Sequence, residues 1–222
     1  MNQYYEDRAD AAIQLIDALP IDRIRSEKWK IVAVSSGGLY IANMVAKKTG
    51  LKAEILFSQA IYAPSNSDCE LGRVSETEEI VIHEELVEAF DIQYDYIYGE
   101  AHRKHEEKIL SDIYHFRKGE QFPNLQDEHV LLIDEGCESG MKLMTGIKSA
   151  MTMNAKAVFV AIPVAPKSVS EALNQIVDEE YVVHEVNDYV KTYCYYKNFK
   201  PISDEEIEKI LNQKTILDIR CE

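Results

Sequence analysis

The feature that most constrains the fold is a series of short apolar runs, each followed by a turn and then by a helix-like segment. The clearest runs are residues 31–34, 130–133 and 157–164. Each is continuously apolar rather than alternating, which is typical of strands buried on both faces. Such strands alternating with helices predict an α/β protein with a central parallel sheet flanked by helices on both faces.

The remaining elements follow from periodicity and from breaker residues. Further helices are predicted over residues 4–19, 39–49, 84–90, 99–117, 141–153, 169–176 and 204–211, and further strands over 53–57, 79–83 and 181–184. Residues 58–71 are predicted to be a loop, because Ser, Asn, Asp and Pro are frequent there. No Gly/Ser linker or Pro-rich joint divides the chain, so we expect a single domain over residues 1–222.

The charge balance excludes several classes of partner. The 39 acidic residues outnumber the 24 basic ones, for a net charge of −15. Such a surface repels the phosphates of nucleic acid, which is therefore not an expected partner. The apolar runs are far shorter than the ~20 residues of a membrane span, and the first residues lack a secretion signal, so we expect a cytoplasmic protein without a membrane partner. The four cysteines form no C-x-x-C pair, which favours reduced thiols.

The clearest ligand signal is the segment that follows the strand at residues 130–133. Asp134 and Glu135 stand at the strand end, where two adjacent acids have little packing reason to be, and their carboxylates can accept hydrogen bonds from paired ribose hydroxyls. A small-residue turn and a helix follow, and backbone N–H groups at such a turn stabilise a phosphate. This phosphate turn consists of Gly136, Cys137, Glu138, Ser139, Gly140, Met141 and Lys142.

With its apolar strand, two acids and small residues before Ser139-Gly140, the segment resembles the signature of the type I phosphoribosyltransferases. Nearly the whole chain is similar to uncharacterised bacterial members of that family. The similar segments are residues 7–11, 36–38 with 41–42, 63–72, 161–166, 195–199 and 203–206. The resemblance implies the same parallel sheet with helices on both faces, together with a small hood and flap region.

The resemblance also implies a role for each part of the site. Asp134 and Glu135 would be the catalytic pair that holds the ribose hydroxyls of 5-phosphoribosyl 1-diphosphate (PRPP), and the phosphate turn would bind its 5′-phosphate. Mg²⁺ would arrive with PRPP rather than through direct protein ligands. The implied reaction transfers ribose 5-phosphate from PRPP to a nitrogenous base and releases pyrophosphate. The first loop, which would meet the pyrophosphate and adopt an unusual backbone such as a cis peptide, consists of Ser35, Ser36, Gly37 and Gly38.

Several residues depart from the family pattern at ligand-facing positions. Ser36 replaces a usually basic residue and Ala60 replaces a lysine of the bacterial relatives, so both remove positive charge from the pyrophosphate side. In the phosphate turn, Glu138 replaces a small residue, and Ser139 and Lys142 replace threonines. A carboxylate ~4 Å from a phosphate charge costs about 4 kcal/mol at an effective dielectric of ~20. The cost falls if Glu138 faces solvent or pairs with Lys142 four positions on.

These departures leave three interpretations open. The leading one is a transferase of the pentosyl type that uses PRPP and Mg²⁺. The second is a protein of the same fold that binds a nucleotide or phosphorylated sugar in a regulatory role without turnover. The third is a structural or interaction protein whose site has decayed. The expected partner is a small phosphorylated molecule, and a homodimer is left open.

Three other patterns have plainer interpretations. His102 and His105 have a metal-ligand spacing, but no third ligand lies nearby in the sequence, so an exposed helix face is favoured. Residues 94–98 alternate at the strand period and predict a packed edge or interface. The tyrosine-rich residues 189–199 are predicted to form a core strand and its edge in preference to a surface that stacks on a base.

Overall fold

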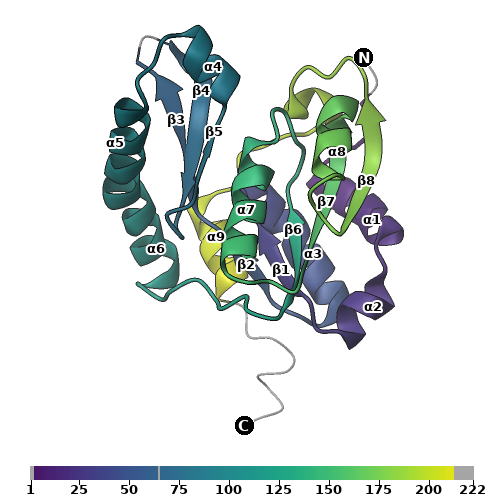
Figure 1. The fold of residues 1–222 in the computed structure, drawn as a ribbon. Helices are drawn as coiled ribbons and strands as arrows, with labels where there is room; N and C mark the ends of the chain where they lie inside the picture. Colours follow the sequence, from purple (N-terminus) through teal and green to yellow (C-terminus); the bar gives the residue numbers. More distant parts are fainter. Residues whose placement is uncertain (1–2, 65, 213–222) are drawn as a thin grey trace.

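The computed structural model describes residues 3–64 and 66–212, which form two sheets (Figure 1). The larger sheet has the strand order β2-β1-β6-β7-β8, and the smaller one has the order β3-β4-β5. Every neighbouring pair in the larger sheet is parallel, which confirms the predicted fold class. Its strands are β1 (Lys30–Ala33), β2 (Ala53–Ile55), β6 (His129–Ile133), β7 (Ala157–Pro166) and β8 (Glu179–Val186).

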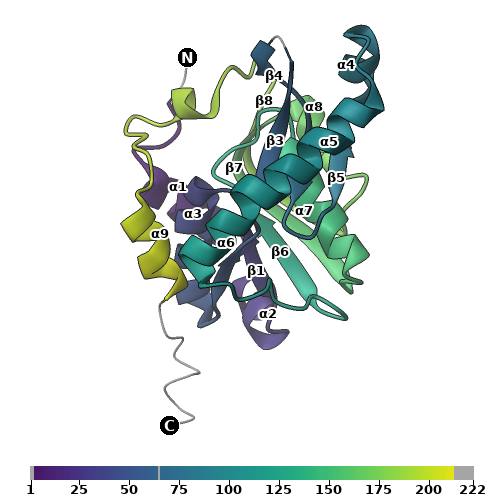
Figure 2. The ribbon, with the colours of Figure 1, turned by 90° about the vertical axis from the view of Figure 1, so that its left-hand side faces the viewer.

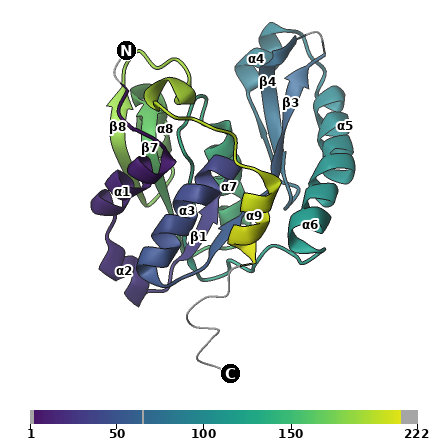
Figure 3. The same ribbon diagram turned by 180° about the vertical axis from the view of Figure 1, so that it is seen from behind.

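Helices cover both faces of the larger sheet, as Figures 1 and 3 show from opposite sides. In β6, Leu131 and Ile133 belong to one apolar core, whereas Val130 and Leu132 belong to the other. Since successive residues of a strand point to opposite faces, a strand buried on both faces must be continuously apolar. The first core is covered by α1 (Arg8–Ala18), α2 (Ile21–Ser26) and α3 (Ser36–Thr49), and the second by α7 (Met141–Thr152) and α8 (Lys167–Leu173).

The strand order reverses between β1 and β6. From β1 the chain passes through α3 to β2 on one side, while β6 pairs with β1 on the other side. The last residues of the two strands, Ala33 and Ile133, are register partners, so the segments that follow them begin side by side. In open α/β sheets, ligands bind at the carboxyl edge where the order reverses. The first loop and Asp134 both lie at this point.

The smaller sheet and its helices form a unit that we call the hood. The sheet consists of the antiparallel strands β3 (Ser58–Ala63), β4 (Asn66–Ser75) and β5 (Ile80–Ile82). Figure 1 shows it between α7 and α5, and in Figure 2 the helix α5 runs across its outer face while α6 continues toward α9 (Asp204–Leu211). The hood helices are α4 (Glu84–Ala89), α5 (Tyr94–Lys104), a π-helical turn (His105–Ile109) and α6 (Leu110–Arg117).

The hood corrects two predictions. Residues 58–71 are not a loop but most of a hairpin, in which Ile61 and Leu71 are fully buried while the polar start of β4 is exposed. Residues 94–98 are not a strand but the first turns of α5, because Ile97 is buried while Tyr94 and Tyr98, one helical turn apart, are exposed. In both segments the packing against neighbouring elements overrides a local composition signal.

The two ends of the described chain pack together on the larger sheet. Asp7 caps α1 by accepting hydrogen bonds from the N–H groups of Ala9 and Asp10, and the backbone around Tyr5 pairs with Tyr196. Residues 189–199 therefore do not form a core strand; they contain a short 3₁₀ helix (Thr192–Tyr195). The predicted final helix is confirmed as α9 (Asp204–Leu211), with a capping box between Ser203 and Glu206.

The helix α2 (Ile21–Ser26) was not predicted: the expected first helix ends at residue 19, before Pro20, and no element was predicted over residues 20–30. Proline is also favoured at a helix start, where its missing N–H would have no helical partner. Pro20 is the N-terminal cap of α2. Within residues 3–64 and 66–212, the helices are all too short or too polar to cross a bilayer.

Candidate functional site

Asp134 lies at the reversal of strand order and fastens two elements there. Its carboxylate Oδ1 accepts hydrogen bonds from the Ser35 hydroxyl and from the Glu135 N–H, the latter at 2.8 Å. The same Ser35 oxygen accepts the Gly38 N–H at 2.9 Å and so caps α3. Asp134 is only 2% exposed. The end of β6 and the start of α3 are therefore held at a fixed distance.

Glu135 forms a buried ion pair with Arg8. The Arg8 Nε donates to Glu135 Oε2 at 2.5 Å, and the two side chains are 9% and 15% exposed. Arg8 also donates to the Lys200 carbonyl and lies over the Phe199 ring, 4.1 Å from its centroid. Burial raises the pKa of the Glu135 carboxyl above its ordinary value, and the charge of Asp134 adds to that rise, while Arg8 opposes it. The pair joins the start, the middle and the end of the described chain.

The first loop is the beginning of α3. Ser35 is the N-terminal cap, and Ser36, Gly37 and Gly38 form the first helical turn. The prediction of a cis peptide at Ser36-Gly37 is wrong, because the described residues contain no cis bond. The helix α3 begins at Ser36, directly after its cap Ser35, and its first turn has ordinary trans peptides. The Glu135 carboxylate lies directly over Gly37: a Cβ added there would be 1.9 Å from Oε2.

The phosphate turn lines a pocket of about 260 Å³ between the larger sheet and the hood. Gly140 has a left-handed backbone with a φ of 81°, which ends the turn and begins α7. The helix α7 therefore starts at the pocket wall. The full lining comprises Asp134, all seven residues of the phosphate turn, Leu143, Thr192, and the hood residues Tyr62, Glu70 and Arg73.

Two side chains of the turn differ sharply in their electrostatics. Burial raises the pKa of the Cys137 thiol to about 12, so at neutral pH it is an uncharged small group. Lys142 lines the pocket and is half-buried, and it forms no ion pair within residues 3–64 and 66–212. A cation without an internal partner, beside a helix start, is suited to an anionic ligand.

Glu138 pairs with a distant segment rather than with Lys142. Its carboxylate accepts hydrogen bonds from Lys191 Nζ at 3.0 Å and from the Thr192 N–H at 3.1 Å. The hydrogen bond to Glu138 raises the pKa of Lys191. Thr192 packs so closely on the turn that a Cβ at Gly136 would be 2.4 Å from its methyl carbon. The carboxylate is thus partly neutralised while it still lines the pocket.

We expect Glu138→Gln to strengthen the binding of inorganic phosphate about threefold to tenfold, because it removes a negative charge from the lining and frees Lys191. Titration calorimetry at low ionic strength measures the effect. Glu107→Gln is the matched control, since Glu107 pairs with Arg103 on the exposed face of the hood. Unchanged or weaker phosphate binding in Glu138→Gln would show that the carboxylate does not oppose an anion in this pocket.

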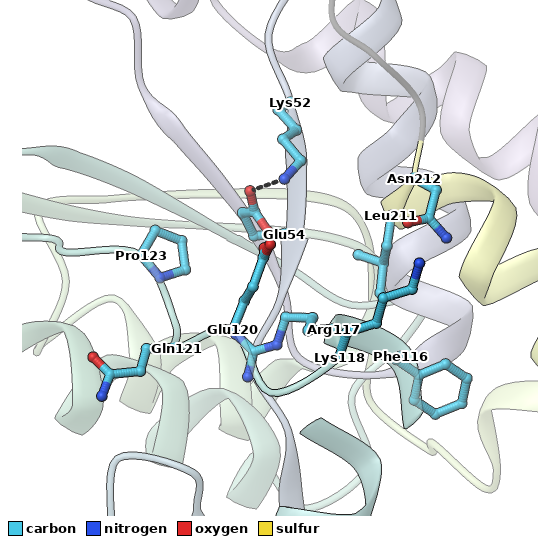
Figure 4. A pocket seen from close by; sticks show the side chains of 10 residues that line it. All are labelled: Lys52, Glu54, Phe116, Arg117, Lys118, Glu120, Gln121, Pro123, Leu211 and Asn212. Carbon is cyan, nitrogen blue, oxygen red and sulfur yellow. Dashed lines mark ion pairs between the residues drawn. The ribbon is translucent and has the colours of Figure 1, made fainter. Parts of the chain in front are cut away.

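A second pocket lies at the other edge of the sheet (Figure 4). It has a volume of about 370 Å³ and lies where β2 begins, beside the ends of α6 and α9. Lys52 and Glu54, both in its lining, form an ion pair at 2.9 Å. No residue predicted from the sequence to bind a ligand lies there. Since ligands of parallel sheets bind at the carboxyl edge, the pocket at the phosphate turn is the stronger candidate.

The histidine pair does not gather metal ligands. His105 lies in the π-helical turn, with Nε2 at 3.3 Å from the Glu76 carbonyl oxygen. His102 is exposed on α5. Across residues 3–64 and 66–212, no three His, Cys, Asp or Glu side chains cluster in a way that could hold a metal ion.

Arg73 and Thr192 line the pocket but were not predicted. Arg73 stands between Leu71-Gly72 and Val74 in the buried second half of β4, and a charge among these small and apolar residues was a signal that could have identified it. No pattern in the sequence around Thr192 indicates that it lines the pocket. Of the aromatic residues nearby, Tyr196 is buried and its hydroxyl donates to the Glu135 carbonyl at 2.5 Å. This hydrogen bond helps to fix the backbone that follows β6.

Comparisons with known proteins agree with the predicted resemblance. No family model matches the sequence. Two curated Mycobacterium tuberculosis proteins, from strains CDC 1551 / Oshkosh and ATCC 25618 / H37Rv, are each named "Putative phosphoribosyl transferase". Each is 21% identical to this chain over 209 residues, which cover 94% of the chain and 46% of the relative. The chain thus spans about half the length of the curated relatives it matches.

Among solved structures, a Thermus thermophilus protein superposes with a TM-score of 0.74 at 24% identity, over 95% of this chain and 98% of that one. A purine phosphoribosyltransferase from Pyrococcus horikoshii Ot3 superposes with a TM-score of 0.45 at 15% identity, over 87% and 93% of the two chains. The second overlap is too loose to relate individual residues. Over nearly its whole length this chain is similar in sequence to the two curated proteins named putative phosphoribosyl transferases, and its central parallel sheet is the fold class that the resemblance to the type I phosphoribosyltransferases implied.

Proposed function

We propose that the chain binds PRPP in the pocket at the phosphate turn and transfers its ribose 5-phosphate to a nitrogenous base. The observation that carries the proposal is the position of Asp134 and the phosphate turn in one pocket, at the reversal of strand order and under the hood. The backbone N–H groups at the start of α7 and the Lys142 ammonium suit the 5′-phosphate. The resemblance to phosphoribosyltransferases supports PRPP as the sugar phosphate.

Asp134 is the residue best placed to hold the ribose. Its Oδ1 is used by Ser35 and the Glu135 N–H, whereas Oδ2 has no hydrogen-bond partner among the described residues. An oxygen held in this way can accept a ribose hydroxyl without first losing a protein contact. Glu135 faces Arg8 and Gly37 rather than the pocket lining, so in this proposal it acts chiefly by holding Arg8.

In the proposed reaction, a nitrogen of the base forms a bond to the ribose C1 as the bond from C1 to the diphosphate oxygen breaks. The electron pair of that bond leaves with pyrophosphate, and the base nitrogen loses its proton to water. The protein positions the partners and stabilises the departing charge. As the resemblance implies, Mg²⁺ would enter on the phosphates of PRPP and neutralise part of their charge.

A regulatory binding protein is the second candidate, and one observation favours it. The Glu135 carboxylate lies over Gly37, in the part of the first loop that a diphosphate would have to approach. A negative charge at that place repels the diphosphate unless Arg8 keeps it neutralised. A protein built in this way could bind a sugar phosphate or a nucleotide without turnover.

The deciding experiment combines calorimetry with an assay of pyrophosphate release. PRPP, ribose 5-phosphate and nucleoside monophosphates are titrated with and without Mg²⁺, and release is measured with adenine, guanine, hypoxanthine, xanthine, uracil and orotate. We expect PRPP binding that requires Mg²⁺, and slow release with at least one base. Asp134→Asn, which keeps the size of the side chain, is expected to weaken PRPP binding and slow release about tenfold. Asp17→Asn, an exposed site on α1, is the control.

The outcomes separate the candidates. Release that falls in Asp134→Asn but not in Asp17→Asn supports the transferase. Tight Mg²⁺-dependent binding with no release for any base supports the regulatory protein. A wild-type chain that binds none of these ligands would overturn both.

A further inference from the structure

The proposed PRPP site lacks positive charge where a diphosphate would lie. Ser36 and Ala60 are uncharged, and the first loop faces the Glu135 carboxylate. A diphosphate carries several negative charges, and this protein has a net charge of −15. Mg²⁺ would neutralise only part of that charge, so a cation from another part of the fold would stabilise the bound diphosphate further.

The hood provides a cation beside Ala60. In the antiparallel pair of β3 and β4, Ala60 and Arg73 are direct register partners. Directly opposite residues of such a pair project from the same face of the sheet. Arg73 therefore extends from the face on which a longer side chain at position 60 would stand, and the small Ala60 leaves room for it. Ser75, two residues on and on the same face, bonds to Ser149 of α7 at 3.0 Å, so this face looks toward α7.

The surroundings of Arg73 hold it in place and leave one nitrogen unused. Its Nε donates to Glu70 Oε1 at 2.8 Å, and its Nη1 donates to the Ser58 hydroxyl at 3.1 Å. The residue is 8% exposed, so it is fixed by packing rather than free in solvent. Its Nη2 has no hydrogen-bond partner among the described residues, and Arg73 lines the pocket opposite the phosphate turn.

We propose that Arg73 binds the diphosphate group of the substrate and replaces, from the neighbouring strand, the basic residue absent at position 60. The inference rests on the proposed function and adds to it a specificity-determining residue. Arg73 lies on the hood wall and Lys142 on the turn wall of the same pocket. Two cations on opposite walls fit a ligand with two separate anionic groups, such as PRPP, better than one with a single phosphate. Arginine is suited to this role because its planar N–H groups can bond to two phosphate oxygens.

The test compares the binding of inorganic pyrophosphate with Mg²⁺, PRPP with Mg²⁺, and inorganic phosphate. Arg73→Ala is expected to weaken pyrophosphate and PRPP about tenfold or more, and phosphate less than about twofold, because the phosphate turn and Lys142 remain. Ala60→Lys in the Arg73→Ala background is expected to restore most of the lost affinity. Arg103→Ala is the matched control, since Arg103 also pairs with a glutamate three residues earlier, Glu100, but lies outside the pocket.

A further variant separates the loss of Arg73 from the exposure of Glu70, which Arg73→Ala leaves unpaired in the pocket. The double variant Glu70→Gln with Arg73→Ala is expected to bind pyrophosphate as weakly as Arg73→Ala. Full recovery in that double variant would overturn the proposal, because the loss would then come from Glu70. Circular dichroism and thermal unfolding check that each variant is folded, and Arg73→Lys supplies a milder change with partial loss expected.

The outcomes also distinguish this inference from the proposed function. Wild-type binding of PRPP and pyrophosphate that is unchanged in Arg73→Ala overturns the role of Arg73 and leaves the proposed function standing. A wild-type chain that binds neither ligand overturns both. Selective loss of pyrophosphate and PRPP in Arg73→Ala, with recovery by Ala60→Lys, supports both.

Discussion

Replacing Arg8 with alanine is expected to lower the free energy of unfolding by about 3–5 kcal/mol, because it leaves Glu135 as a buried charge without its partner. The two side chains are only 9% and 15% exposed, so the Glu135 carboxylate lies where water hydrates it poorly. The change also removes the hydrogen bond to the Lys200 carbonyl and the contact with the Phe199 ring. Urea unfolding followed by circular dichroism measures the loss.

The loss should depend on pH with a defined sign. The pKa of Glu135 in the folded protein is already above its ordinary value of 4.5, chiefly through burial, and without Arg8 it rises further. A group with a raised pKa binds more protons in the folded state than in the unfolded state, so stability falls as the pH rises from the ordinary pKa through the raised one. Arg8→Ala should therefore be closer to the wild type near pH 4.5 than at neutral pH.

Two variants control this prediction. Arg25→Ala removes an arginine that also pairs with an acid, Asp22, and donates to a carbonyl, that of Lys48, but its side chain is 53% exposed. Its effect should remain within about 1 kcal/mol. Adding Glu135→Gln to Arg8→Ala should recover part of the stability and flatten the pH dependence. A loss in Arg8→Ala no larger than that in Arg25→Ala would contradict the buried ion pair.

Replacing Gly38 with alanine is expected to destabilise the protein by about 1–3 kcal/mol, although alanine is the better helix former. A Cβ at Gly38 would lie 2.7 Å from the Ile133 carbonyl oxygen and 2.9 Å from the Asp134 Cα. These are backbone atoms, which cannot rotate away, so α3 must shift from β6. The shift would also strain the hydrogen bond from Ser35 to Asp134. Thermal unfolding measures the stability, and phosphate titration reports on the site.

Gly99→Ala is the matched control, because Gly99 is also a helix glycine but has no atom within 4 Å of an added Cβ. There the helix propensity acts alone, and we expect a gain of about 0.5–1 kcal/mol. The two glycine substitutions should thus have opposite signs. A gain of stability in Gly38→Ala would show that α3 and β6 are not in close contact where the strand order reverses.

The hood also bears on the choice between catalyst and binding protein. In this structure the cations that line the pocket, Arg73 and Lys142, come from the hood and from the phosphate turn, whereas the first loop carries none. Catalysis requires stronger interaction with the departing pyrophosphate than with the bound substrate. If Arg73 binds the diphosphate, the hood takes on the task that the first loop lacks the charge to perform.

The sequence by itself determined the central sheet and the position of the phosphate turn. The apolar runs that became β1, β6 and β7 report burial on both faces, which is a local and periodic signal. The capping residues of α9 and the glycine that ends α3, Gly50 with a φ of 75°, are likewise local. These features depend on residues within a few positions along the chain, so they can be predicted from the sequence alone.

The tertiary structure alone decided the hood hairpin and the partners of the charged residues at the site. Arg8 and Glu135 are 127 positions apart, and Glu138 reaches Lys191 rather than the closer Lys142. The pairing of Ala60 with Arg73 appears only once β3 and β4 are in register. The sequence spacing of charged residues does not predict which of them pair, because Coulomb attraction depends on distance in space. That distance is set by how the strands and helices pack.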